Sequence, residues 1–533
     1  MKRSDTVPTE DITQRQARIV LILLILLGLV LRSVSIGREA LWADEALTAV
    51  LVRYPWWSFA VTSIDPSPPL FYWLEKLLVP DGAGAVAWRM VSLVAGVVTI
   101  ALAYWLGREL SSRGGGLVTA GLVAASAPLV DYSQEARAYA LAVAMIAGSA
   151  AALAAVTGGR LAGDRQRSAR RRMLAVFAMF TIFAIFSHFI ALLWVLPALV
   201  ALRLATEPTW RKIEPREMLA TGLAVALFLA IEFRRLVIYQ FEQNGFSWLE
   251  QMSPARIVRT LGEQWLPFAN IIGWPAALAG AALLMGLLWW ARKALVAWGQ
   301  ARPLQAMIVA ALLFEPLGLW LIGLIAPPVA MPRTFLPAGL GFAALVGIAI
   351  ASLSRRLAVV VGAAVTGLSL ASLLIAGTVR PKEQWAVAGQ VTMGAPVVIN
   401  CANWKTPAFL AAAKGPGLGL VITSSGNKAL AVHQPGDSAS WDRLYFERVQ
   451  RVGHSPLRHG RPAMIERRPI RIKQLLFVAS ECSATERHAF AEWADLRASK
   501  LLWSSSAVGD VAAIQVEEWQ LGGTRPLDLW IVH

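Results

Sequence analysis

The chain has 533 residues, of which 56% are hydrophobic and only 16% are charged, and its mean hydropathy is +0.54. Soluble domains carry charge on about a quarter of their residues. Repeated apolar stretches of membrane-spanning length, rather than the short alternating segments of a barrel, predict a polytopic α-helical membrane protein. The net charge of +16 fits basic loops on one membrane face, and no basic-aromatic stripe indicates nucleic acid as a partner.

About eleven apolar windows are long enough to be read as spans. They fall at residues 19–36, 86–107, 115–131, 137–157, 173–187, 190–204, 218–234, 268–290, 304–326, 336–353 and 357–377. The first follows a polar tail over 1–18 and lacks a small-residue cleavage site, so we expect an uncleaved span. The stretch 173–204 is divided at Ser187–His188 into a short helical hairpin.

Charge in the short loops predicts the orientation. Loops 108–114, 158–172, 203–217, 291–303 and 354–356 are basic, which places them and the N-terminus in the cytoplasm. The long loop 37–85 and the short connections between spans near residues 135 and 333 then lie on the extracytoplasmic side. We therefore expect a transmembrane domain over 19–378 and an extracytoplasmic C-terminus.

From 379 to 533 the apolar runs shorten to strand length, at 397–399, 420–422 and 475–478, and a helical pattern covers 484–499. This region is predicted to be an extracytoplasmic α/β domain. Cys401 and Cys482 both fall in it. They form either a disulfide or two small buried residues.

The outer loop 37–85 carries an acid pair, Asp44-Glu45, just past the first span. A carboxylate at the rim of a membrane cavity is suited to take a proton from a hydroxyl, and the alternative is a pair of solvated loop charges. Asp65 lies in Asp-Pro-Ser-Pro-Pro, whose prolines hold a turn rigid. It either points into a cleft or caps a helix.

Two further outer joints carry arginines. Arg137 lies in Asp131-Tyr-Ser-Gln-Glu-Ala-Arg-Ala-Tyr139, where its planar fork suits a phosphate and Glu135 is placed to orient it. Arg333 lies in Pro-Arg-Thr-Phe-Leu-Pro, and Lys382 follows the last span on the same side. The alternative interpretation is that each of these cations anchors the chain at the membrane interface.

His188, the one histidine of the membrane region, is either a substrate contact or a structural residue. No metal-ligand spacing occurs, so no metal site is predicted, although Asp44, Glu45 and Asp65 have the oxygen ligands of a divalent cation.

These motifs in this order resemble the GT-C glycosyltransferases, and within them the bacterial dolichyl-phosphate-mannose-protein mannosyltransferase-like group that includes aminoarabinose transferases. The resemblance covers about residues 19–385 and rests on Asp44-Glu45, the Pro-Pro-Leu turn, Tyr-Ser-Gln-Glu-Ala-Arg-x-Tyr and Arg-Thr-Phe-Leu-Pro. Relatives often have histidine where Ser67 stands.

The resemblance implies an enzyme of the bacterial inner membrane that moves a sugar from a polyprenyl-phosphate donor to an extracytoplasmic acceptor, which is a glycolipid, a cell-envelope glycan or a protein. Asp44 would be the base with Glu45 beside it, and Asp65 would shape the acceptor side. Arg137 and Arg333 would hold the donor phosphate. From the residues themselves, Lys382 is a further candidate for that phosphate, and Tyr132, Glu135, Tyr139 and His188 are candidate substrate contacts. The alternative is a transporter or lipid flippase.

Overall fold

The structure is a computed structural model. It describes residues 12–53, 56, 67–80, 83–158, 167–205, 230, 250–377 and 390, together with eight strands between 397 and 532. The chain forms two compact units, and each is described by itself. Unit 1 comprises residues 1–36, 56–78 and 89–379, and unit 2 comprises 37–55, 79–88 and 380–533.

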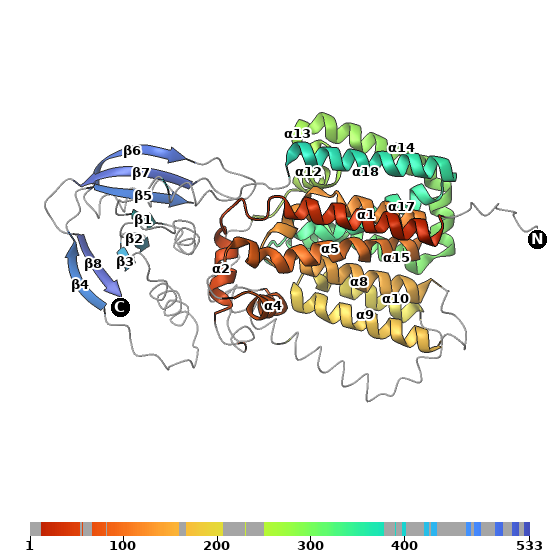
Figure 1. The fold of residues 1–533 in the computed structure, drawn as a ribbon, viewed down its shortest axis with the longest axis horizontal. Coiled ribbons are helices and arrows are strands. Elements are labelled where there is room, and N and C mark those ends of the chain that lie inside the picture. The colour runs from red at the N-terminus through yellow and green to blue at the C-terminus, as the bar shows by residue number, and fades with distance from the viewer. Residues whose placement is uncertain are drawn as a thin grey trace, which may run out of the picture. The chain divides into compact units, whose positions relative to one another are not determined.

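Unit 1 is a bundle of helices, drawn from red to teal in Figure 1. Its helices are α1 (Gln14–Ser33), α4 (Leu70–Leu78), α5 (Ala85–Leu110, whose first turn belongs to unit 2), α6 (Arg113–Ala124), α7 (Ala127–Asp131), η1 (Tyr132–Gln134), α8 (Tyr139–Thr157), α9 (Arg167–Ser187), α10 (Ala191–Ala205), α12 (Pro254–Trp265), α13 (Ala269–Ile272), α14 (Trp274–Ala301), α15 (Pro303–Leu313), α16 (Glu315–Ile322), η5 (Pro332–Phe335), α17 (Leu336–Ala351) and α18 (Arg355–Ala376).

Within the described residues, six helices are long and apolar enough to cross a membrane: α1, α5, α8, α14, α17 with its preceding turn, and α18. Two bent pairs raise the number to eight. Length and composition of the described residues therefore support fewer spans than the eleven predicted. The predicted window 218–234 lies outside the described residues, except for residue 230. The division of 173–204 is confirmed, since α9 ends at Ser187 and α10 begins at Ala191.

The two bent pairs fall in the predicted windows 115–131 and 304–326, each of which was read as one span. Helix α6 and the α7–η1 segment meet at 62°, and α15 and α16 meet at 55°. A proline lies in the first turn after each break, Pro128 in α7 and Pro316 in α16. Proline disfavours the helical conformation in the residue before it and cannot donate a backbone hydrogen bond, so a continuous helix ends there.

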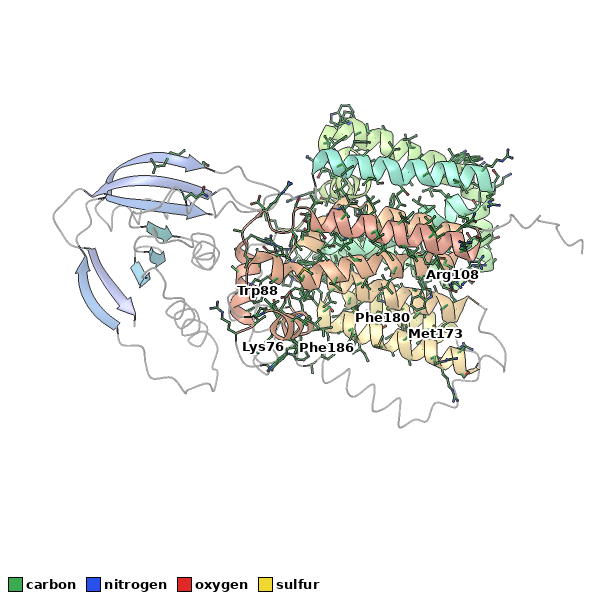
Figure 2. All side chains as sticks on the ribbon, viewed as in Figure 1. Lys76, Trp88, Arg108, Met173, Phe180 and Phe186 are labelled. Carbon is green, nitrogen blue, oxygen red and sulfur yellow. The ribbon has the colours of Figure 1, made fainter. Side chains whose placement is uncertain are left out.

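Small residues let the helices of the bundle pack closely. Helix α8 is rich in alanine, and 89% of its most apolar window is buried. A Cβ added to Gly148 would overlap the ring of Phe180 on α9, which Figure 2 labels. Ser149 of α8 also hydrogen-bonds Thr181 of α9 at 2.8 Å and accepts the indole N–H of Trp194 of α10 at 2.9 Å. Close backbone approach and buried hydrogen bonds are the usual means of helix association in membranes.

The fully buried guanidinium of Arg32, near the end of α1, holds the bend between α6 and α7. Its Nη1 donates to the carbonyl of Ala124 and its Nη2 to that of Val123, both at 3.2 Å. Its Nε donates to the hydroxyl of Ser133 at 3.2 Å, beyond the bend. The broken helix therefore exposes these carbonyls to a donor instead of to lipid.

The opposite end of the bundle gathers the loops that were predicted to share one membrane face. Nη1 of Arg113 donates to the carbonyl of Ile12 at 3.3 Å. The carbonyl of Leu110 accepts from the Trp298 indole at 2.9 Å and from Arg302 at 3.1 Å. The structure thus brings the predicted loops 108–114 and 291–303 together at one end, with the start of α1. Residues 291–301 are not a loop, however, because they continue helix α14.

Unit 2 contains helix α2 (Ala43–Leu51) and an eight-stranded mixed sheet. The strands are β1 (Val397–Asn400), β2 (Val421–Ser425), β3 (Lys428–His433), β4 (Ile465–Ile470), β5 (Gln474–Ser480), β6 (Leu496–Ser504), β7 (Ile514–Leu521) and β8 (Leu527–Val532). Their order is β4-β8-β3-β2-β1-β5-β7-β6, with β1 parallel to both β2 and β5.

The three predicted strands are confirmed as β1, β2 and β5. The helical pattern predicted over 484–499 is wrong at its end, because Leu496 begins strand β6, which pairs antiparallel with β7. Cross-strand pairing outweighs local helical spacing at this sheet edge. Residues 484–495, Cys401 and Cys482 lie outside the described residues.

Replacing Arg32 with leucine is expected to destabilise the protein by about 3 kcal/mol, because two carbonyls and a hydroxyl lose their buried donor. Thermal unfolding in detergent measures the change. Arg18, an exposed arginine of the same helix, supplies the matched control, Arg18→Leu. Equal unfolding temperatures for the two variants would contradict a role for Arg32 in holding the bend.

Candidate functional site

Tyr139, the first residue of α8, is the centre of a cluster of side chains from three separate segments. Its ring centroid lies 5.5 Å from that of Tyr132 and 5.0 Å from that of His188. The guanidinium carbon of Arg333 lies 5.9 Å from the same ring. Four of the residues predicted to contact substrate or phosphate are therefore brought together, although 201 positions separate the first from the last.

Each member is held by local structure. The hairpin between α9 and α10 fixes His188, whose Nδ1 accepts the backbone N–H of Ile190 at 3.2 Å. In the turn η5, Thr334 accepts the N–H of Met331 at 3.1 Å and donates to the carbonyls of Val329 and Met331. Arg333 is thus carried on a short turn that is anchored by a buried hydroxyl, and its Nε lies 2.7 Å from the Met331 sulfur.

Arg137 lies two residues before Tyr139 and is 8% exposed. Its Nη1 donates to the hydroxyl of Tyr72 on α4 at 3.4 Å, and its carbonyl accepts from Ser92 on α5 at 3.0 Å. Glu135 is also buried. The planar guanidinium of arginine has the geometry that suits a phosphate or carboxylate.

In unit 2, Asp44 and Glu45 lie in the first turn of α2 and differ in their surroundings. Glu45 is fully buried, and its Oε2 accepts the N–H of Trp42 at 3.2 Å, which is the return bond of a capping box. Asp44 is half-buried. The two acids therefore have separate tasks, since Glu45 secures the start of the helix and Asp44 has the more accessible carboxylate.

Asp65 and Lys382, which were predicted to contribute to the acceptor and phosphate sites, lie outside the described residues. Among the residues that the structure does describe, no three His, Cys, Asp or Glu side chains are grouped as a metal site would require.

Buried charged residues inside the apolar windows escaped the sequence analysis, and Arg32 and Glu315 are two of them. Arg32 and Glu315 are both buried in the bundle. Each is an isolated charge within or at the end of a long apolar run, and such a charge is the sequence signal that marks a residue with a specific partner or role in a membrane protein.

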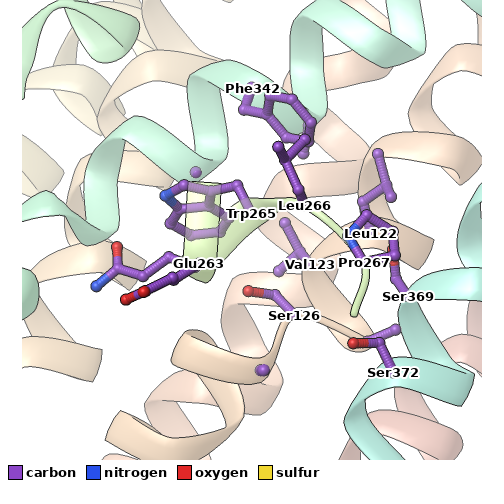
Figure 3. Close-up of a pocket in the computed structure, with 15 residues that line it drawn as sticks. Leu122, Val123, Ser126, Glu263, Trp265, Leu266, Pro267, Phe342, Ser369 and Ser372 are labelled. Carbon is purple, nitrogen blue, oxygen red and sulfur yellow. The ribbon is translucent and has the colours of Figure 1, made fainter. Parts of the chain in front are cut away.

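An open cavity lies between the α6–α7 bend, the end of α12, α17 and α18 (Figure 3). Its walls are mostly apolar, with Leu122 and Phe342 among them, and Ser126 and Ser372 add hydroxyls. Gln264 in this wall donates to the carbonyl of Pro332 at 2.8 Å. The cavity wall is therefore joined directly to the turn that carries Arg333.

No protein-family model and no curated protein matches the sequence. Solved structures match by fold. ArnT from Cupriavidus metallidurans in the apo state aligns with a TM-score of 0.55 at 14% identity, over 94% of this chain and 98% of that one. The Archaeoglobus fulgidus oligosaccharyltransferase, tethered with an acceptor peptide containing the NVT sequon, aligns with a TM-score of 0.50 at 10% identity, over 90% of this chain and 71% of that one. The chain therefore shares the fold of membrane glycosyltransferases, as the GT-C resemblance predicted.

Replacing Tyr139 with alanine is expected to lower stability by about 3 kcal/mol, because a buried ring that contacts Tyr132 and His188 is lost. Tyr139→Phe retains the ring and should unfold within about 1 kcal/mol of the parent protein. Thermal unfolding in detergent compares the two. Similar losses for both variants would show that the hydroxyl, rather than the ring, holds the cluster.

Proposed function

We propose that the protein is a membrane glycosyltransferase that moves a sugar from a polyprenyl-phosphate donor to an acceptor hydroxyl at the extracytoplasmic face of a bacterial inner membrane. The observation that carries the proposal is the cluster at Tyr139, in which Arg333 lies by an aromatic ring and Arg137 lies on the same segment as that ring. Two guanidinium groups beside aromatic rings suit a phosphate joined to a sugar. The fold that the chain shares with ArnT supports this proposal.

The proposed chemistry is a single displacement. Asp44 takes the proton of the acceptor hydroxyl while that oxygen attacks the anomeric carbon, and the bond from that carbon to the phosphate oxygen breaks. Arg137 and Arg333 stabilise the negative charge that grows on the leaving phosphate. With one base and no covalent carboxylate partner, the configuration at the anomeric carbon inverts. The capping bond of Glu45 makes Asp44 the better candidate for the base.

The open cavity gives the donor lipid a place in this scheme. Its apolar walls suit a prenyl chain, and the Gln264–Pro332 hydrogen bond joins those walls to the Arg333 turn. A lipid lying along the cavity would bring its phosphate towards Arg333.

A transporter or lipid flippase is the second candidate, because both bent pairs interrupt spans and Glu315 is buried at one of the breaks. Discontinuous helices with intramembrane charge are typical of transporters. Proteoliposomes separate the two functions. A transporter moves the sugar lipid across the bilayer unchanged, whereas a transferase releases free polyprenyl phosphate.

Asp44→Asn is expected to lower sugar transfer by roughly 10²–10⁴-fold, the usual contribution of a positioned base. The readout is mass spectrometry of cell-envelope glycans from cells that express either the parent protein or the variant. In cells with the variant, the glycan that carries the added sugar unit should be depleted. Glu39→Gln, which changes another acid of the same loop, is the control. Near-full transfer by the Asp44 variant would remove Asp44 from the mechanism.

Arg333→Gln is expected to weaken binding of undecaprenyl phosphate by roughly 10–100-fold, because a charge-assisted hydrogen bond is lost. Binding is measured by native mass spectrometry of the purified protein in nanodiscs. Arg256→Gln removes an exposed arginine on α12 and should bind as the parent does. If both variants bind equally well, the phosphate lies elsewhere.

A further inference from the structure

Glu315 is a buried acid for which the proposed chemistry has no use. It begins α16, immediately after the break in the bent α15–α16 pair, and is 5% exposed. Neither of its carboxyl oxygens has a hydrogen-bond partner of regular geometry within the described part of the chain. Buried polar atoms are almost always paired, so such a carboxyl calls for a group that the protein itself does not supply.

The carboxyl lies at the N-terminus of α17. The backbone N–H of Ala338, the third residue of that helix, is directed towards it without completing a regular hydrogen bond. The first four N–H groups of a helix have no partner within the helix. The carboxyl of Glu315 therefore faces the first turn of α17.

The same place adjoins the Arg333 turn. Helix α16 contacts both η5 and α17. Leu319 of α16 shares an apolar cluster with Ala330 and Phe335, which flank Arg333. Ala338 follows Arg333 by five residues. Glu315 thus lies beside the segment that positions the cation proposed to hold the donor phosphate.

We propose that Glu315 binds a hydroxyl of the transferred sugar beside the first turn of α17. This inference rests on the proposed function. Whether ionised or protonated, a carboxyl offers an acceptor oxygen, so it recognises a group that donates, and a sugar hydroxyl both donates and accepts. In a polyprenyl-phosphate sugar, the group joined to the phosphate is the sugar. A prenyl chain has no donor along its length and cannot satisfy the carboxyl.

The test compares lipids with and without the sugar. Native mass spectrometry in nanodiscs measures binding of undecaprenyl phosphate and of a panel of its monosaccharide esters carrying glucose, mannose, galactose or arabinose. For the ester that the parent protein prefers, Glu315→Leu is expected to lower affinity roughly tenfold or more, the size of one hydrogen bond to a carboxyl. Its affinity for bare undecaprenyl phosphate should be unchanged. Glu315→Gln keeps an acceptor oxygen and should restore most of the preference.

A matched control removes a buried polar side chain from the other part of the same bent pair. Gln305 of α15 donates to the carbonyls of Glu109 and Ala154 at the opposite end of the bundle, so Gln305→Leu disturbs packing without touching the sugar. Equal losses for both lipids in Glu315→Leu, or a loss of sugar preference in Gln305→Leu, would overturn the inference while leaving the proposed function intact. If the parent protein binds no lipid of either kind, the proposed function itself fails.

Discussion

The arrangement of unit 1 depends on one side chain, the buried guanidinium of Arg32. A helix that breaks inside a membrane must find donors for the carbonyls that the break exposes. Arg32 supplies them to Val123 and Ala124, and it also reaches Ser133 beyond the break. These hydrogen bonds hold the chain before and after the break, so they set its direction between α6 and α8. Because Tyr132, Arg137 and Tyr139 follow on that chain, the position of the candidate site depends on this contact.

The candidate site itself is assembled from segments that are distant in the sequence. An aromatic ring at the start of α8 meets a histidine from the hairpin between α9 and α10 and an arginine from the turn before α17. Rings give a rigid surface at little entropic cost, and arginines bind anions with defined geometry. The cluster thus combines the two kinds of contact that a sugar phosphate requires.

Two of the buried charges of the bundle, Arg32 and Glu315, have different surroundings. Arg32 donates to three backbone carbonyls, and these hydrogen bonds give it a structural role. Glu315 lies at the other break and has no regular partner in the part of the chain that the structure describes. Both breaks are followed by proline, so the chain needs no acid to end α15. This difference is the reason that we assign a ligand to the second site and only a structural role to the first.

The sequence by itself determined the class of the protein, most of the helical segments and three strands, because apolar run length and loop charge respond directly to the membrane and to local periodicity. It also identified Tyr132, Arg137, Tyr139 and Arg333 as candidates from their motifs, and His188 as the one histidine of the membrane region. Only the tertiary structure decided that four of them, all but Arg137, meet at one ring, that two helices bend, that Glu45 caps α2 and that residues 496–499 form a strand. These outcomes depend on contacts between distant segments, which local sequence does not encode: a bend needs a donor from another helix, and an edge strand needs its partner.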